Sequence, residues 1–120
     1  MLQAKRIGAH GEDLAIEWLA KRGYALVARN VISRGGELDI IMRRGRHWMF
    51  VEVKTRREGN ESSAVHDIHP SQVRRLAKQV EWQVVRRGIE DWRLILVCVT
   101  LSPRSAKIKY IDLTDSLDFR

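Results

Sequence analysis

The sequence predicts one α/β domain in which helices flank a mixed sheet, with the element order α-β-β-β-α-β-β. Two segments carry apolar residues at spacings of three and four, as amphipathic helices do, and five shorter segments have strand character. The second helix falls between the third and fourth strands, which is typical of a crossover between parallel strands. The 120 residues allow one hydrophobic core. We therefore expect a single domain spanning residues 1–120.

The first predicted helix begins near Ile7 and stops at Gly23. Its apolar positions recur at helical spacing: Leu14, Ala15, Trp18 and Leu19. Tyr24–Asn30 is then typical of a short strand. A polar, glycine-rich break through Ser33, Gly35 and Gly36 separates this strand from the next one.

Residues 37–43 and 48–56 have the composition of two strands, and the four residues between them form a connector of hairpin length. We therefore expect these strands to pair antiparallel. Residues 57–69 are polar and lack periodicity, which predicts a surface loop.

Pro70 is well placed at the start of a second helix that continues to Gly88. Trp92–Leu101 is almost continuously apolar, which is typical of a central strand covered on both faces. Residues 107–113 alternate again as a final strand. The locally acidic tail from Asp112 onward is predicted to be a frayed terminus.

The charge balance favours a polyanionic partner. Lys and Arg number 22 against 15 Asp and Glu, which gives a net charge of +7 and a pI near 10.2. Nucleic acid is the first candidate. The single cysteine, Cys98, excludes an internal disulfide framework. Because no apolar run approaches the roughly 20 residues of a membrane span and the first residues lack the apolar stretch of a secretory signal, we expect a cytoplasmic protein without a membrane partner.

Acidic residues gather on one face of the first predicted hairpin strand. Alternation places Glu37 and Asp39 on the face of Ile41. The opposite face then carries Leu38, Ile40 and Met42. Two carboxylates would therefore project from the same side of the sheet.

The second hairpin strand places Glu52 and Lys54 on one face. A hairpin register in which paired residue numbers sum to about 91 would set Asp39 opposite Glu52. Two carboxylates at one place suit Mg²⁺ or Mn²⁺, with waters and phosphate oxygens completing the shell. Lys54 could then position a water or offset charge on a phosphate. The alternative is an ordinary solvated strand face, but the strongly apolar neighbours favour a site near the core.

Three segments, GAHGEDLAIEWLAKRGYALVARN, GGELDII and FVEVKTR, resemble the YraN-like family of small uncharacterised bacterial proteins. That family is predicted to belong to the PD-(D/E)xK nuclease superfamily and is similar, more distantly, to archaeal Holliday-junction resolvases. The resemblance extends from about Gly8 to Leu101. It implies a restriction-endonuclease-like fold, and its junction-resolvase branch suggests a homodimer.

The resemblance also implies roles for individual residues. Asp39 and Glu52 match the metal-binding acids of the superfamily, and Lys54 matches its lysine. Glu12 matches the helix glutamate that completes the metal shell or orients a water. Gln72 stands where relatives usually carry a lysine, although glutamine occurs there in other branches.

Glu37 lies in the GE-x-D string of the family, where it would support the metal ligands or face the substrate. The sequence departs from the family after the VKTR segment, where relatives tend to have Phe-Gly and this chain has a somewhat longer polar stretch. That departure bears on substrate contacts made by the loop more than on the metal site.

Basic residues surround the acidic positions along the chain. The predicted contacts to nucleic acid are Arg43, Arg44, Arg56, Arg57, Arg74 and Lys78. The second helix also carries Arg75, Arg86 and Arg87. Arg74 and Lys78 are four residues apart, so they share a face of this helix. A rim of cations would offset the repulsion between an acidic centre and DNA. The alternative is a solvated helix surface.

Two further features favour structural roles. Trp18 and Trp82 could stack on bases, but packing is the simpler role at their helix positions. His66 and His69 form an HxxH pair without a third zinc ligand nearby, which favours a plain loop.

These observations together predict a metal-dependent DNA endonuclease that acts on branched or otherwise structured DNA. One alternative is a non-catalytic module that binds nucleic acid within a DNA repair or uptake complex, which would not need Asp39, Glu52 and Lys54 together. Another is a basic structural protein of a ribonucleoprotein, for which we expect salt-sensitive RNA binding without metal dependence.

Overall fold

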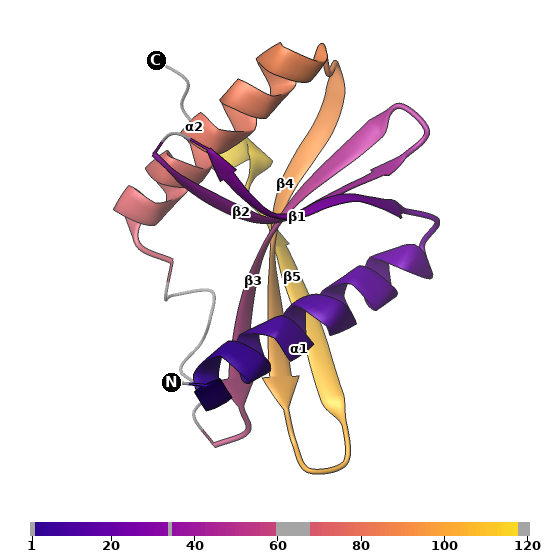
Figure 1. The fold of residues 1–120 in the computed structure, drawn as a ribbon, viewed down its shortest axis with the longest axis vertical. Coiled ribbons are helices and arrows are strands. Elements are labelled where there is room, and N and C mark those ends of the chain that lie inside the picture. The colour runs from indigo at the N-terminus through magenta and orange to yellow at the C-terminus, as the bar shows by residue number, and fades with distance from the viewer. Residues whose placement is uncertain (1, 34, 60–67, 118–120) are drawn as a thin grey trace.

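The computed structural model describes residues 2–33, 35–59 and 68–117, which form helices on both faces of a five-stranded sheet (Figure 1). The elements follow the predicted order, so the fold class predicted from the sequence is confirmed. They are α1 (Leu2–Ala20), β1 (Ala25–Ser33), β2 (Gly36–Arg44), β3 (His47–Arg57), α2 (Pro70–Arg87), β4 (Asp91–Leu101), β5 (Ala106–Asp112) and a short 3₁₀ helix, η1 (Thr114–Ser116).

The strands lie in the order β1-β2-β3-β4-β5, and the sheet is mixed because β3 and β4 are parallel while the other neighbours are antiparallel. Helix α2 provides the crossover between these two parallel strands, as expected. In the β2–β3 hairpin Ile40 pairs with Val51 and Arg44 with His47, so the predicted sum of 91 is confirmed for this part of the ladder.

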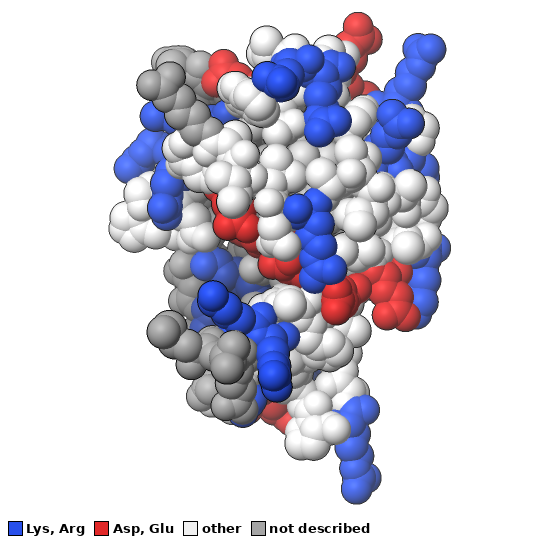
Figure 2. Space-filling model, viewed as in Figure 1, with Lys and Arg blue, Asp and Glu red and all other residues white. Residues whose placement is uncertain are grey.

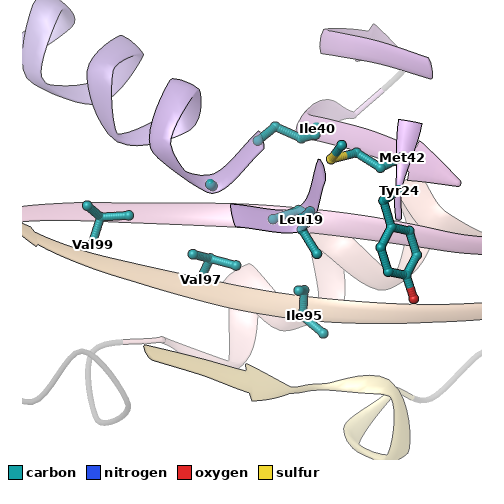
Figure 3. Close-up of a cluster of buried hydrophobic side chains, with 9 residues drawn as sticks. Leu19, Tyr24, Ile40, Met42, Ile95, Val97 and Val99 are labelled. Carbon is teal, nitrogen blue, oxygen red and sulfur yellow. The ribbon is translucent and has the colours of Figure 1, made fainter. Parts of the chain in front are cut away.

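The core has two halves, one on each face of the sheet. Helix α1 covers one cluster, to which Leu19 and the strand residues Ile40 and Val97 contribute (Figure 3). Helix α2 covers the other cluster, which includes Leu76 and Phe50. Each fully buried side chain of this kind contributes about 1.5–3 kcal/mol of hydrophobic stabilisation.

Strand β4 supplies both halves of the core. Ile95, Val97 and Val99 pack on the α1 side, whereas Leu94 and Leu96 pack on the α2 side. The prediction of a strand covered on both faces is therefore confirmed. It also explains why this segment shows no polar alternation.

Some boundaries differ from the sequence prediction. Helix α1 begins at Leu2, because residues 2–6 are good helix formers even though they lack an apolar repeat. Strand β1 continues to Ser33 and strand β3 to Arg57. The predicted loop at 57–69 is therefore shorter at its start, and residues 60–67 lie outside the described part of the chain.

The prediction of a frayed tail from Asp112 is wrong for the first residues of that tail. Asp112 ends β5, and Leu113 is buried in the α2-side cluster. The hydroxyl of Thr114 then accepts a hydrogen bond from the Leu94 backbone at 3.0 Å. One buried leucine anchors this segment. The acidic composition of the tail gave no indication of its burial.

Within the described residues, no helix has both the length and the sustained hydrophobicity that crossing a bilayer requires.

His69 caps the N-terminus of α2, because its Nδ1 accepts a hydrogen bond from the Ser71 backbone at 3.2 Å. The other histidine of the HxxH pair, His66, lies outside the described residues.

Helix α1 approaches β3 closely at Gly11. A Cβ at this position would fall on Oγ1 of Thr55 and within 2.9 Å of its other side-chain atoms. Gly8, one turn earlier, would meet nothing within 4 Å. The absence of a side chain at Gly11 therefore sets the distance between helix and sheet.

We expect Gly11→Ala to lower the free energy of unfolding by about 1–3 kcal/mol, because the methyl group must push α1 away from β3. Gly8→Ala is the matched control and should stabilise the protein by about 0.5–1 kcal/mol through helix propensity. Urea denaturation followed by circular dichroism measures both. Similar stabilities for the two variants would contradict the close contact.

Candidate active site

Strands β2 and β3 part at Asp39. The last ladder pair on this side is Ile40 with Val51. Beyond it, Oδ2 of Asp39 accepts a hydrogen bond of 2.8 Å from the backbone N–H of Val53. A side-chain carboxylate thus replaces the missing strand contact and is held in the gap between the two strands.

The opening of the sheet coincides with a reversal of faces in β2. Ile40 lies in the α1-side cluster and Leu38 in the α2-side cluster, although both were predicted to share a face. That prediction is wrong, because strict alternation fails at the residue between them, Asp39. Regular alternation holds only where the backbone is regularly extended.

Strand β1 reverses at the matching position. Arg29, paired with Ile40, reaches α1, whereas Val31, paired with Leu38, packs on the α2 side. Between them, Asn30 has a φ of 52°, the one positive value for a non-glycine residue in the described part of the chain. Asparagine tolerates this left-handed conformation better than most residues do. Both strands therefore change faces at the site, β1 at Asn30 and β2 at Asp39.

The carboxyl groups of Asp39 and Glu52 lie close enough for the charge of one to act on the other. Burial, followed by the hydrogen bond and the negative charge of Asp39, raises the pKa of Glu52 to about 9. The positive charge of Lys54 and a hydrogen bond with Gln72 act in the opposite direction. Two carboxyls this close cannot both ionise cheaply, so the pair holds a proton near neutral pH.

Helix α1 brings a third carboxylate, Glu12, to the same place. Burial and the charge of Asp39 raise its pKa, while hydrogen bonds from Arg29 and Asn30 lower it. Nε of Arg29 donates to Oε1 of Glu12 at 3.2 Å, and Nη1 donates to Asp13 at 2.6 Å. Arg29 thus joins the edge strand to α1 and fixes the position of Glu12.

The side chain of Asn30 connects two acidic residues. With its amide nitrogen turned toward the carboxylates, it donates to Oε1 of Glu37 at 3.1 Å and to Oε1 of Glu12 at 3.3 Å. Glu37 is therefore tied to the acidic group, in line with its expected supporting position.

Two hollows meet at the Asp39–Glu52 pair. The first is lined by Glu12, Asp39, Glu52, Thr55, Arg56 and Arg57, together with residues of α1. The second lies toward α2 and is lined by Glu37, Asp39, Glu52, Gln72, Arg75 and Gln79, among others. In the view of Figure 2, acidic side chains lie across the middle of the molecule, with Lys and Arg side chains above and below them. The pair is thus accessible from both sides.

The structure brings most of the predicted site residues together. Glu12, Asp39, Glu52 and Gln72 line the hollows, and Lys54 lies close enough for its charge to act on Glu52. Arg56 and Arg57 line the first hollow.

Arg43 and Arg44 lie elsewhere, at the turn end of β2. The Arg43 guanidinium is 5.4 Å from the ring centre of Trp48, and that of Arg44 is 4.6 Å from the ring centre of Tyr24. Alternation predicts the face of the sheet on which a residue lies, but not its position along the strand. Four residues of strand separate Arg43 from Asp39 by about 13 Å. Arg74 and Lys78 are exposed on α2 and line neither hollow.

Two residues of the site were not among the predicted ones. Arg75 was predicted on α2 but not as a site residue, and it lines the second hollow beside Gln72. The sequence predicts Asn30 only as the last residue of a strand. An asparagine between apolar strand residues was the available signal, because asparagine is depleted in regular strands and tolerates positive φ.

The donor set fits a hard divalent cation. Within residues 2–33, 35–59 and 68–117, no three His, Cys, Asp or Glu side chains converge as a closed metal-binding group. Mg²⁺ commonly takes only one or two carboxylates and keeps several waters or phosphate oxygens. Asp39 and Glu52 can supply those two carboxylates. A cation there would offset the burial and the repulsion that raise the pKa of Glu52.

A sheet covered by helices on both faces, with paired carboxyls in a gap between two strands, defines a small α/β protein with an acidic site. The chain belongs to the uncharacterised protein family UPF0102, the YraN family expected from the sequence, whose pattern matches residues 11–99. It is 36% identical over 110 residues to a UPF0102 protein of Geobacter sulfurreducens, covering 89% of this chain and 86% of that protein. It is 39% identical over 87 residues to one of Symbiobacterium thermophilum, covering 72% and 74% of the two chains.

The raised pKa of Glu52 makes stability depend on pH. Between its unfolded pKa near 4.5 and its folded pKa of about 9, the folded protein binds the proton more tightly, so the free energy of unfolding falls as pH rises. We expect Glu52→Gln, measured in EDTA, to remove this loss and to raise the Tm at pH 8 relative to wild type. Each ~1 kcal/mol regained corresponds to roughly 4 °C.

The control is Glu58→Gln, which changes an exposed carboxylate just beyond β3 and should leave the pH profile unchanged. Thermal unfolding of the three proteins from pH 5 to pH 9 makes the comparison. Parallel profiles for wild type and Glu52→Gln would refute the protonated carboxyl pair.

The left-handed backbone at Asn30 predicts an unusual order of substitutions. We expect Asn30→Gly to be more stable than Asn30→Ala by about 1 kcal/mol, because glycine accepts a positive φ without steric cost. At Ile32, an exposed position of the same strand without a positive φ, the order should reverse. Chemical denaturation of the four variants tests this, and the same order at both positions would contradict it.

Proposed function

We propose that this protein is a Mg²⁺-dependent DNA endonuclease that hydrolyses phosphodiester bonds at the Asp39–Glu52 pair. The observation that carries the proposal is the pairing of two carboxyls in the gap between β2 and β3, open to hollows on both sides. A partly buried acidic pair is costly for folding, and such a cost is typical of sites kept for binding or chemistry. The net charge of +7 is in line with a nucleic-acid substrate.

Mg²⁺ or Mn²⁺ held by Asp39 and Glu52 would supply positive charge at the phosphodiester and lower the pKa of an attacking water. In hydrolysis the water oxygen bonds to phosphorus and one P–O ester bond breaks, leaving a phosphate monoester and a hydroxyl. The protein contributes the placement of both carboxylates. The Val53 N–H holds Asp39, and Gln72 holds Glu52.

Lys54 lies one pleat beyond Glu52 on β3, where an ammonium group can contact the phosphate or the attacking water. Glu12, held by Arg29 and Asn30, can accept a hydrogen bond from that water. Arg56 and Arg57 line the adjoining hollow and offer positive charge to neighbouring phosphates. The resemblance to junction resolvases makes branched DNA the first substrate form to test.

The test is single-turnover cleavage of labelled linear, nicked, flapped and four-way DNA with Mg²⁺, Mn²⁺ or EDTA. Asp39→Ala should lose metal binding and cleavage together. Lys54→Ala should keep metal and DNA binding but cleave about a hundredfold more slowly or worse, as loss of one positioned charge can cause. Calorimetry with Mg²⁺ or Mn²⁺, and DNA binding in Ca²⁺, separate the two effects.

Glu90→Gln, at an exposed position between α2 and β4, is the matched control and should behave as wild type. Wild-type cleavage rates in Lys54→Ala would exclude the proposed mechanism. If the wild type binds DNA tightly but cleaves none of the forms, the non-catalytic binding module becomes the better interpretation.

A further inference from the structure

Trp82 is the exposed tryptophan of the described residues. Its side chain is 44% accessible, whereas Trp18, Trp48 and Trp92 are each partly buried against the core clusters. The expectation that Trp82 packs inside the molecule is therefore wrong. A large aromatic surface left in water is costly, and it commonly marks a binding site.

Cations surround the exposed indole. The guanidinium of Arg86 lies 4.7 Å from the ring centre of Trp82. Both residues line a shallow hollow on α2, together with Lys78, Glu81 and Val85. Glu81 is the one carboxylate in this lining. An aromatic ring between a lysine and an arginine matches a strand that carries both bases and phosphates.

This hollow continues the flank of α2 that borders the acidic site. Arg75, Lys78, Trp82 and Arg86 follow one another at spacings of three, four and four residues, so they form one stripe along the helix. Arg75 lines the second hollow beside Asp39 and Glu52. With a rise of 1.5 Å per residue, Trp82 lies about 10 Å further along the helix axis.

From this geometry we propose that the Arg75–Arg86 stripe of α2 binds a single strand of DNA as it leaves the acidic site, with an unpaired base stacked on Trp82. The bases of a duplex are stacked on each other and cannot reach a side-chain ring, whereas an unpaired base can. Lys78 and Arg86 attract the flanking phosphates. Charge complementarity favours this occupant over an apolar protein surface, which would bury both cations without partners.

The inference rests on the proposed function and specifies the form of the DNA substrate. The substrate would carry an unpaired segment next to the cleaved bond, as a flap or a gapped fork does, rather than consist of continuous duplex. Trp82 and Arg86 would select this substrate form without touching the reacting atoms.

The experiment is fluorescence anisotropy of a labelled single-stranded oligonucleotide and of the matching blunt duplex, in Ca²⁺ so that binding is measured without cleavage. Trp82→Ala should weaken single-strand binding roughly tenfold or more, since stacking on one aromatic side chain contributes about 1–3 kcal/mol per base. Binding of the duplex should change less than twofold. Trp82→Phe should retain part of the affinity, because a smaller ring still stacks.

Tyr110→Ala removes an aromatic side chain on β5 that is 57% exposed and lies outside the stripe, and it should bind both DNA forms as wild type does. Equal single-strand affinity in Trp82→Ala and wild type would overturn the inference, and so would an equal loss for single strand and duplex. If the wild type cleaves no DNA form while single-strand binding still depends on Trp82, the nuclease proposal fails, but the proposal that the Arg75–Arg86 stripe binds single-stranded DNA is supported. The two failures are therefore distinguishable.

Discussion

The acidic pair in the gap of the sheet is the constraint around which the rest of the molecule is organised. Two carboxyl groups removed from water repel each other and lose their hydration, which opposes folding. The structure offsets this cost through the backbone N–H of Val53, the amide of Gln72 and the charge of Lys54. These groups come from the loop side of β3 and from α2, so the pair acquires all its partners only when the sheet and α2 have formed.

Both faces of the sheet contribute to the same site because two strands lose their alternation there. Asn30 and Asp39 stand at the point where β1 and β2 exchange faces, so side chains that regular strands would separate are brought together. Helix α1 adds Glu12 from one side, at a distance set by Gly11, and α2 adds Gln72 and Arg75 from the other. A three-layer arrangement with an opening in its middle layer thereby makes one site from residues distant in sequence.

Periodicity predicted the elements well because burial produced it. Helix α2 and strand β4 have faces or whole segments in the core, and their patterns in the sequence record that directly. Periodicity did not predict the burial of Leu113 or the first turn of α1, because a single apolar residue, or none, produces no repeat. For the site, the hairpin register predicted that Asp39 and Glu52 lie near each other, whereas the position of Arg43 depends on distance along a strand. The role of Asn30 depends on a backbone angle that no spacing rule contains.

The left-handed residue in β1 also affects the open edge of the sheet. Edge strands expose unpaired backbone groups that can recruit a strand from another molecule and so start aggregation. In β1 the register shift between Leu26 and Ala28 and the turn at Asn30 break the regular row of donors and acceptors. At the other edge β5 presents the exposed lysines 107 and 109, whose charges oppose such pairing. The distortion that shapes the acidic site therefore also protects the folded chain from joining its sheet to another.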